Sequence, residues 1–419
     1  MKRILALVLA LAMIFVFAGC GESGKKEALG MSASPLPSLE IKADYQIADD
    51  FKIGFICLHD EKSTYDLNFI NAAKDAQKAL GLKDEQVILK VNVPEGNECY
   101  VAAADLVDQG CDIVFANSFG HEDFMIQAAK NFPNVQFCHA TGTKAHTEGL
   151  ANYHNAFASI FQGRYLAGIA AGLKLNEMIK EGKITAEEAK MGYVGAYTYA
   201  EVISGYTSFY LGAKSVCPTV TMDVQFTGSW YDATEEKNAA EALLARKCVL
   251  ISQHADSMGA PGACEAAGVP NVSYNGSTYE ACPTTFIVSS RIDWAPYFNY
   301  IIRCVSKGEA IAADWCGGIE QGSVVLTGVN QDVAAEGTVD AIKAAVADFK
   351  AGKINVFDTK NFTVEGKTVT TYTADVDTDA AFAPDTEAIE NGVFTESTKR
   401  SAPYFDLRID GITLLNQKF

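Results

Sequence analysis

The sequence predicts an α/β protein with two doubly wound, parallel-sheet lobes joined by a hinge. Short apolar runs of strand length alternate with amphipathic helical stretches, and this alternation occurs twice along the chain. Continuous apolar strands are typical of parallel sheets that helices cover on both faces. After the N-terminal region about 370 residues remain, which suffices for two domains of ordinary size.

The first residues are typical of an export signal. Lys2 and Arg3 precede an apolar run, 4–18, that is shorter than the roughly 20 residues a membrane-spanning helix needs. Small residues then precede Cys20, an arrangement that resembles the lipid-attachment site of bacterial lipoproteins. We therefore expect residues 1–19 to be a signal peptide and Cys20 to carry a lipid that anchors the chain on the extracytoplasmic face of the membrane. The alternative is a plain secretory signal.

The stretch after the signal has a second interpretation. Gly19, Gly24 and Lys25 satisfy most of a phosphate-binding loop, but Lys26 stands where that loop needs a Ser or Thr for magnesium. An NTPase is therefore not indicated. Residues 20–48 combine Ser, Gly, Pro and scattered charge without a period, so we predict a flexible linker there.

Charge and cysteine content exclude several classes. The formal net charge of −18 argues against binding to nucleic acid or to an anionic membrane surface, because both need a basic surface. The 11 Cys include no C-x-x-C pair, so a zinc ribbon or thioredoxin-type site is not indicated. Cys57, Cys111 and Cys248 lie inside apolar runs and are expected to be small core residues.

The first strand–helix series occupies 53–140. The runs FKIGFICL, QVILKVNV, CDIVFANS and NVQFCHATG are its predicted strands, and the helices lie around YDLNFINAAKDAQKALGL, YVAAADLVDQG and DFMIQAAKNF. A long helix through FQGRYLAGIAAGLKL leads out of the series.

The second series occupies 192–275. Its predicted strands lie in MGYVGAYTY, VTMDVQFTG, CVLISQHADS and NVSYNG, and its helices lie in VISGYTSFYLGAKSV, EEKNAAEALLAR and GACEAAG. The strand TTFIVSSRIDW, the helix YFNYIIRCVSKG, the strand SVVLTGV and the helix VDAIKAAVADFKAG follow. In 360–419 we expect a short hairpin around VEGKTV and a C-terminal segment packed on the second lobe. The N-terminal lobe is predicted to comprise 49–165 and about 286–318, and the C-terminal lobe 166–285 and about 319–419.

The ends of these strands are rich in aromatic and neutral polar residues. In open α/β sheets ligands bind outside the carboxyl ends of the strands, and two lobes that face each other can close over such a ligand. Planar rings beside neutral donors and acceptors favour a flat heteroaromatic ligand or a polar sugar, and the scarcity of basic residues argues against a phosphorylated one. The predicted ligand-binding residues are Thr64, Tyr65, Asn68, Asn117, Phe119, Tyr197, Trp230, Asp256 and Asn275.

Some of these residues have a structural alternative. Thr64 and Ser257 could equally cap the helices that follow them, and Phe119 and Tyr199 could equally be core residues. Trp230 and Asp256 are the strongest candidates, because a large aromatic ring and a carboxylate directly after strands need an explanation.

Several longer motifs resemble one family. SQHADS and ANSFGH after strands, the helix EVISGYTSFYLGAKSVCP, and IDWAPYF followed by WCGGIEQGSVVL look like the basic membrane protein family of purine-nucleoside-receptor-like lipoproteins. The likeness extends from about residue 50 to residue 350. It implies a type I periplasmic-binding-protein fold, capture of a purine nucleoside or a related solute, and delivery to an ABC permease with a separate ATPase.

The family's site carries over only in part. Its nucleoside-binding members grip the ribose with an Asp where this chain has Asn275, and with a Lys where this chain has Arg291 or Asp293. A Gly-rich turn of the family is replaced by HADS, which introduces Asp256. The ligand is therefore expected to be a purine base or a purine nucleoside, and these departures from the family favour the base, with Asp256, Asn117 and Asn68 at its edge and Trp230 or Tyr65 on its face. Riboflavin or another heteroaromatic solute remains an alternative.

The rival class is an enzyme such as an extracellular nucleoside hydrolase. His254 and Asp256 are two residues apart, which on a strand places both on one face. The sequence has no H-E-x-x-H, G-x-S-x-G or phosphate-loop motif, and Asp60 with Glu61 is a poor match for the aspartate cluster such a hydrolase needs. We therefore expect a binding protein without catalytic residues, metal or cofactor, and we expect no adhesive role.

Overall fold

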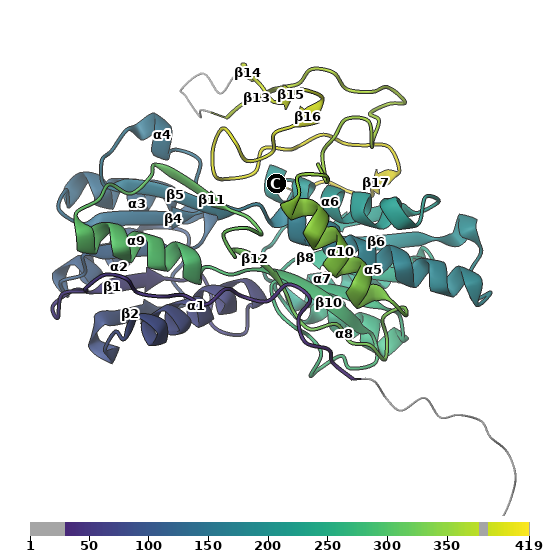
Figure 1. Cartoon of the computed structure of the whole chain (residues 1–419), viewed down its shortest axis with the longest axis horizontal. Coiled ribbons are helices and arrows are strands. Elements are labelled where there is room, and N and C mark those ends of the chain that lie inside the picture. The colour runs from purple at the N-terminus through teal and green to yellow at the C-terminus, as the bar shows by residue number, and fades with distance from the viewer. Residues whose placement is uncertain (1–29, 377–383, 419) are drawn as a thin grey trace, which may run out of the picture.

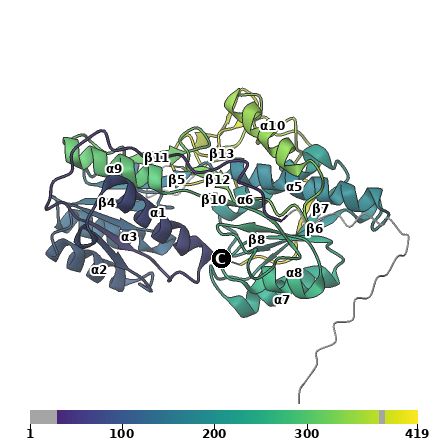
Figure 2. The same ribbon diagram turned by 60° about the horizontal axis from the view of Figure 1, so that its bottom comes forward.

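The computed structural model describes residues 30–376 and 384–418, and these residues form two α/β lobes side by side (Figures 1 and 2). One lobe is built on a sheet of order β11-β5-β4-β3-β1-β2, and the other on a sheet of order β12-β10-β9-β8-β6-β7-β17. The predicted fold class is therefore confirmed. The predicted signal peptide and Cys20 lie outside the described residues. Within those residues, none of the helices has both the length and the apolar character needed to cross a bilayer.

All neighbouring strands of the first sheet are parallel. Its strands are β1 (Ile53–Ile56), β2 (Val87–Lys90), β3 (Ile113–Ala116), β4 (Gln136–Ala140), β5 (Tyr153–Ala158) and β11 (Asp314–Gly317). The helices of this lobe are α1 (Thr64–Leu80), α2 (Asn97–Asp108), α3 (Glu122–Asn131), α4 (Ala145–Glu148) and α9 (Ala295–Lys307). The two strands β5 and β11 were not expected from the sequence.

The second sheet is parallel except for β12, which pairs antiparallel with β10. Its strands are β6 (Lys190–Gly195), β7 (Thr221–Phe226), β8 (Leu250–His254), β9 (Asn271–Tyr274), β10 (Phe286–Ile292), β12 (Val324–Leu326) and β17 (Ile412–Leu414). The helices of this lobe are α5 (Ile160–Lys180), α6 (Ala200–Val216), α7 (Ala233–Ala245), α8 (Gly259–Ala267) and α10 (Thr338–Lys350).

Between β1 and β12 the chain passes from one lobe to the other at three places, namely from β5 to α5, from β10 to α9 and from β11 to β12. Two of these places differ from the predicted boundaries. α5 begins directly after β5 and packs on α6 and β10, so the second lobe begins near residue 160 rather than 166. β10 extends the second sheet beside β9, so only α9 and β11 of the stretch 286–318 belong to the first lobe.

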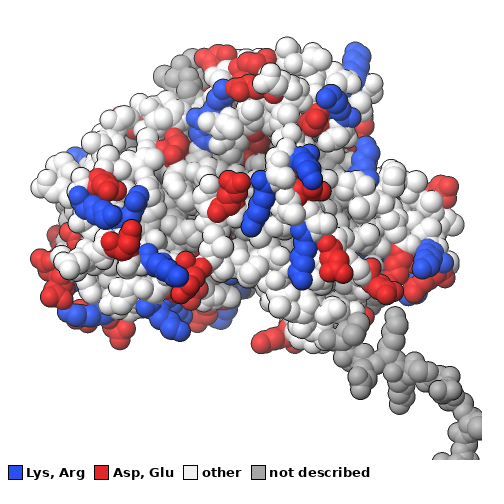
Figure 3. All heavy atoms as spheres, viewed as in Figure 1, with Lys and Arg blue, Asp and Glu red and all other residues white. Residues whose placement is uncertain are grey.

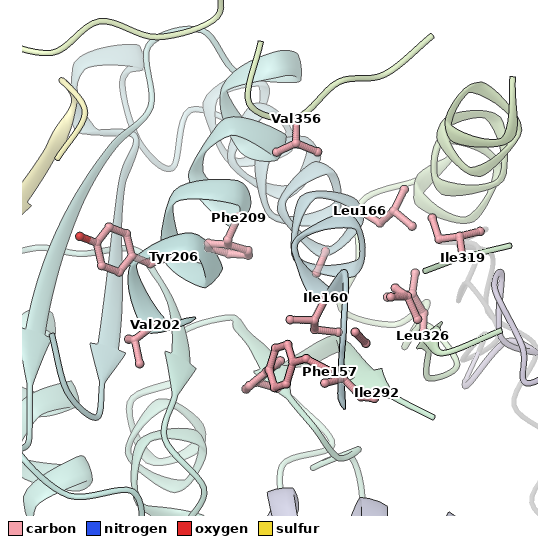
Figure 4. Packing of buried hydrophobic residues seen from close by; sticks show 14 of the residues in the cluster. Phe157, Ile160, Leu166, Val202, Tyr206, Phe209, Ile292, Ile319, Leu326 and Val356 are labelled. Carbon is pink, nitrogen blue, oxygen red and sulfur yellow. The ribbon is translucent and has the colours of Figure 1, made fainter. Parts of the chain in front are cut away.

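Glycines allow α5 and α6 to approach closely in the core of the second lobe. A Cβ on Gly168 would lie 2.1 Å from the carbonyl oxygen of Phe209, and a Cβ on Gly212 would lie 2.1 Å from that of Tyr165. Phe209 of α6 and Leu166 of α5 belong to one buried apolar cluster (Figure 4). The pair of helices therefore forms a rigid support beneath the strands that lead to the cleft.

Arg164 on α5 is fully buried, which sequence reasoning did not anticipate. Its Nη2 donates to the hydroxyl oxygen of Ser252 at 2.7 Å and to that of Tyr193 at 3.3 Å. Its Nη1 donates to the carbonyl oxygen of Ser273 at 3.2 Å. The guanidinium also lies 5.1 Å from the ring centroid of Tyr274, so one side chain ties α5 to β6, β8 and β9.

The prediction of a flexible linker is wrong for residues 30–48. This segment runs along one side of both lobes (Figure 1), and Leu36 is buried in the main core. The backbone N–H of Leu326 in β12 donates to the carbonyl oxygen of Leu36 at 2.9 Å, and the Tyr45 hydroxyl donates to the Asn299 side chain of α9 at 2.8 Å. Composition misled here, because the segment is ordered by a strand and a helix far away in the sequence.

The C-terminal extension begins with the predicted hairpin. Val364 and Lys367 exchange backbone hydrogen bonds of 2.9 and 3.0 Å across the turn. The end of the chain adds β17 to the second sheet beside β7, as expected for a segment packed on the second lobe. The small strand pairs are β13 (Thr373–Ala374), β14 (Thr386–Glu387), β15 (Ile389–Glu390) and β16 (Val393–Phe394).

The extension also reaches the first lobe, which was not predicted. The backbone N–H of Ser401 donates to a carboxylate oxygen of Asp314 in β11 at 2.8 Å. On the other side Ser204 of α6 donates to the buried carboxyl group of Glu396 at 2.5 Å. The extension thus bridges the two lobes above the hinge (Figure 1).

Glu396 should make stability depend on pH. Burial raises the pKa of Glu396 to about 7 from 4.5, so the folded state binds this proton more tightly than the unfolded chain. Its contribution is therefore greatest below pH 4.5, declines as the pH rises to about 7, and is constant above. We expect the unfolding free energy of the wild type to fall relative to Glu396→Gln by on the order of 3 kcal/mol between pH 4.5 and pH 8.

The measurement is urea unfolding of both proteins at several pH values. The control is Glu390→Gln, because Glu390 is an exposed residue of the same extension whose partner is Lys399. Its pH profile should follow the wild type. If the unfolding free energies of the wild type and Glu396→Gln changed with pH in the same way, the pKa of Glu396 would be the same in the folded and unfolded states. That result would contradict the prediction.

Candidate functional site

A cavity lies between the lobes, at the carboxyl ends of the strands of both sheets. The first lobe contributes residues that follow β1, β3 and β4, and the second lobe contributes residues at or after the ends of β6, β7, β8 and β9. The lining consists of Leu58, His59, Tyr65, Asp66, Ser118, Phe119, Thr141, Glu201, Trp230, His254, Asp256, Tyr274 and Asn275. The cavity therefore lies where parallel α/β sheets place their ligands.

Five of the predicted ligand-binding residues line this cavity, namely Tyr65, Phe119, Trp230, Asp256 and Asn275. Phe119 is not a core residue, because its side chain is 41% exposed, and its ring centroid lies 5.4 Å from that of Tyr199 in the other lobe. The expected combination of aromatic faces and neutral polar groups is thus present on the cavity wall.

The other four predicted residues, Thr64, Asn68, Asn117 and Tyr197, do not line the cavity. Asn117 supports the wall, because its Nδ2 donates to Asp66 at 2.7 Å and its carbonyl oxygen accepts from the hydroxyl of Tyr65 at 2.7 Å. Tyr197 stacks on Tyr199 with ring centroids 5.0 Å apart, and its ring meets the cavity-lining ring of Trp230 edge-on.

Thr64 and Asn68 connect the two lobes. The backbone N–H and the hydroxyl of Thr64 donate to the carbonyl oxygen of Asp256, at 3.0 and 3.2 Å. Nδ2 of Asn68 donates to Oδ1 of Asn275 at 3.2 Å. Thr64 is the first residue of α1 and does not cap it, since the hydroxyl of Ser63 accepts the capping hydrogen bond. The lobes are therefore in contact around the cavity, as in a closed state.

Ser257 behaves differently from Thr64. Its hydroxyl oxygen accepts a hydrogen bond from the backbone N–H of Gly259 at 3.0 Å, at the start of α8. The N-cap of α8 is Met258 and no side chain caps the helix, so Ser257 contacts the start of α8 without capping it; it does not line the cavity either.

Asp66 is the main residue of the wall that sequence reasoning missed. Its carboxylate is buried and accepts from the backbone N–H of His59 at 3.1 Å as well as from Asn117. Burial would raise the pKa of Asp66, but hydrogen bonds from His59, Asn117 and Ser63 outweigh it and hold the pKa below its ordinary value. Asp66 is therefore a buried carboxylate that stays ionised. Its available signal was an acidic residue in the first turn of the helix after the first strand.

Asp256 has the opposite electrostatics. Burial, followed by repulsion from Asp66, Glu236 and Glu201, raises the pKa of Asp256 well above its ordinary value, and the amide of Asn275 offsets this in part. The ionised form of Asp256 is therefore unfavourable, and binding a proton or accepting a hydrogen bond from a ligand would stabilise this carboxyl group.

Three buried polar atoms of the cavity lining lack hydrogen-bond partners among the described residues. They are the hydroxyl of Tyr274, Nδ2 of Asn275 and Nδ1 of His254. Asn275 directly follows β9 with φ of 63°, a left-handed conformation that Asn tolerates better than most residues. Buried polar groups without partners are costly in a folded protein, so these atoms indicate a place for a polar ligand.

The lining contains the carboxyl groups of Asp66, Glu201 and Asp256 and neither Lys nor Arg. Glu201 lies 3.5 Å from Nε2 of His254, whose pKa burial holds below its ordinary value. Among the described residues, no group of three or more His, Cys, Asp or Glu side chains is arranged to hold a metal ion. The wall therefore suits a neutral ligand with hydrogen-bond donors rather than an anion.

Comparison with known proteins agrees with this geometry. A model of the ABC transporter substrate-binding protein PnrA-like family matches residues 56–359. A purine-binding protein of Brucella abortus is 30% identical over 315 residues, which cover 74% of this chain and 83% of that protein. A putative ABC transporter glucose-binding protein of Haloferax volcanii is 30% identical over 225 residues, or 54% of each chain.

Solved structures support the fold. A solute-binding protein of an ABC transporter system from Conexibacter woesei superimposes with a TM-score of 0.58 at 19% identity, covering 73% of this chain and 97% of that one. The family is one of transport binding proteins and not of enzymes, so the hydrolase alternative is set aside. This chain belongs to the PnrA-like family of ABC transporter substrate-binding proteins and is the extracytoplasmic, ligand-binding component of such a transporter.

Proposed function

We propose that the protein captures a purine, the free base in preference to the nucleoside, in the cavity between its lobes. The observation that carries this proposal is the polar edge formed by Asp256 and Asn275 beside the aromatic rings of Tyr65 and Trp230. A carboxyl group accepts from the ring N–H and amino groups of purines, and the rings offer stacking surfaces for the flat heterocycle. The similarity to a purine-binding protein supports the same ligand class.

The preference for a base rests on the absence of a charged ribose clamp from the cavity lining. The resemblance placed such a clamp at Asn275 and at Arg291 or Asp293. Arg291 instead donates to the hydroxyl of Ser38 at 3.0 Å, and Asp293 accepts from the backbone N–H of Ala295 at 3.1 Å. Neither residue lines the cavity, so of the positions that match the family's clamp only the neutral amide of Asn275 is in the lining.

The remaining steps follow from the same proposal. The open lobes admit the purine, closure buries it, and the closed form delivers it to an ABC permease whose partner ATPase drives transport. Cys20 is proposed to anchor the mature chain in the membrane through a lipid. On the face seen in Figure 3 acidic and basic side chains are interspersed, which is unlike the continuous basic surface that nucleic-acid binding requires.

A sugar is the second candidate ligand. The similarity to a putative glucose-binding protein favours it, and neutral polar groups beside aromatic rings also suit a sugar. The three carboxyl groups of the lining do not distinguish the two ligands, since both carry hydrogen-bond donors.

Thermal unfolding of a chain beginning at residue 21 tests the proposal against a panel of adenine, guanine, hypoxanthine, their nucleosides, riboflavin and glucose. A ligand at 100 times its Kd should stabilise the folded state by about 2.7 kcal/mol. We expect stabilisation of this size with the bases and a smaller stabilisation with the nucleosides. A shift with nucleosides alone would contradict the missing clamp, and a shift with glucose or riboflavin alone would contradict the purine.

A further inference from the structure

We propose that Asn68 is a positioning residue that turns the NH2 group of Asn275 toward the ligand, so that the site requires a hydrogen-bond acceptor on the ligand's edge. This inference rests on the proposed function, because it concerns how the same cavity reads a purine. Asn68 does not itself line the cavity.

The two side chains come from different lobes. Asn68 is a buried residue of α1 in the first lobe, and Asn275 directly follows β9 in the second. Nδ2 of Asn68 donates to Oδ1 of Asn275 at 3.2 Å. The backbone N–H of Asn275 donates to the carbonyl oxygen of Ser290 at 2.9 Å, which fixes the point from which the side chain leaves the chain.

An amide group has an acceptor end and a donor end, and a hydrogen bond at one end decides which end remains. Because Oδ1 of Asn275 is taken by Asn68, the end that remains is the NH2 group. That Nδ2 is buried and makes no hydrogen bond of good geometry with a described residue. It lies close enough to the carboxyl group of Asp256 to lower the pKa of that group, and an NH2 group has two N–H donors, so one remains for a ligand. A buried donor without a partner is unfavourable, so the closed lobes favour a ligand that places an acceptor there.

Asp256 lies beside this donor and is held by the same helix. Its carbonyl oxygen accepts from both the backbone N–H and the hydroxyl of Thr64, the first residue of α1. The site thus offers an NH2 donor at Asn275 next to a carboxyl group at Asp256. A purine edge with a ring nitrogen or carbonyl acceptor beside an N–H or amino donor is complementary to this pair.

The test compares adenine with its 1-deaza, 3-deaza and 7-deaza analogues, each of which lacks one ring-nitrogen acceptor, by isothermal titration. In the wild type we expect one analogue to bind about tenfold or more weakly than adenine, because it leaves the Asn275 donor unpaired. In Asn68→Leu the side-chain amide of Asn275 is free to turn. The ratio of the affinity for adenine to the affinity for that analogue should therefore fall to about threefold or less.

Asn71→Leu is the matched control, because Asn71 is an exposed residue of the same helix. It should keep the wild-type ratio. If Asn68→Leu does not fold, the smaller change Asn68→Ala serves the same comparison, with circular dichroism as the check. If Asn68→Leu weakened the binding of adenine and of every analogue by the same factor, the positioning role would be overturned. It would also be overturned if the wild type bound all four ligands with the same affinity. Binding of no purine to the wild type would instead overturn the proposed function.

Discussion

Asp256→Ala is expected to weaken purine binding about 100-fold without destabilising the fold. The carboxyl group is the polar edge of the proposed site, and removing it leaves a donor of the buried ligand without a partner, which costs about 3 kcal/mol. Burial and the neighbouring carboxyl groups raise the pKa of Asp256, so this residue destabilises the folded protein when no ligand is bound. Removing it should therefore leave the unfolding free energy equal or higher.

Isothermal titration with adenine and urea unfolding measure the two effects separately. Asp75→Ala is the matched control, because Asp75 is exposed on α1. It should change neither quantity. Wild-type affinity in Asp256→Ala would remove this carboxyl group from the site, whereas a large loss of stability would mean that Asp256 supports the fold rather than the ligand.

Arg164→Ala is expected to lower the unfolding free energy by about 3–5 kcal/mol. The substitution leaves the hydroxyl groups of Tyr193 and Ser252 and the carbonyl oxygen of Ser273 without their buried donor, and it opens a cavity beneath β6, β8 and β9. Purine affinity should also fall, because the guanidinium packs on Tyr274, whose ring lines the binding cavity.

Urea unfolding is the direct measurement, with Arg303→Ala as its control. Arg303 is a partly exposed helical arginine whose contacts are Glu309 and the ring of Tyr300, so its removal should cost less than about 1 kcal/mol. Equal, small losses in both variants would contradict the structural role of Arg164.

The sequence was a good guide to the sheets, because their apolar runs are long and regular. FKIGFICL and CVLISQHADS both contain the strands expected of them, β1 and β8. It was a poor guide to β11 and β17, since DWCG is neither long nor apolar and both strands are ordered by pairing with distant ones. For the same reason the segment 30–48 was mistaken for a linker.

The rule that ligand-binding residues follow the strands predicted where the cavity lies. It was less successful in predicting which of those residues line the cavity. Trp230 and Asp256 lie four and two residues after the ends of β7 and β8, and both line the cavity. Thr64 and Asn68 also follow a strand, eight and twelve residues after the end of β1 at Ile56, yet they contact the opposite lobe. Whether such a residue lines the cavity or contacts the opposite lobe depends on how the two lobes pack against each other, and the local sequence does not determine this. Asp66 was missed because its importance depends on donors from His59 and Asn117.

The measurement that tests the central claim most directly is native mass spectrometry of the protein purified from cells as a chain beginning at residue 21. If the cavity is a purine-base site, gentle desolvation should release the protein with an added mass equal to adenine, guanine or hypoxanthine, and Asp256→Ala should lack it. An added mass equal to a hexose, or to a nucleoside, would contradict the account of a base read by Asp256 and Asn275.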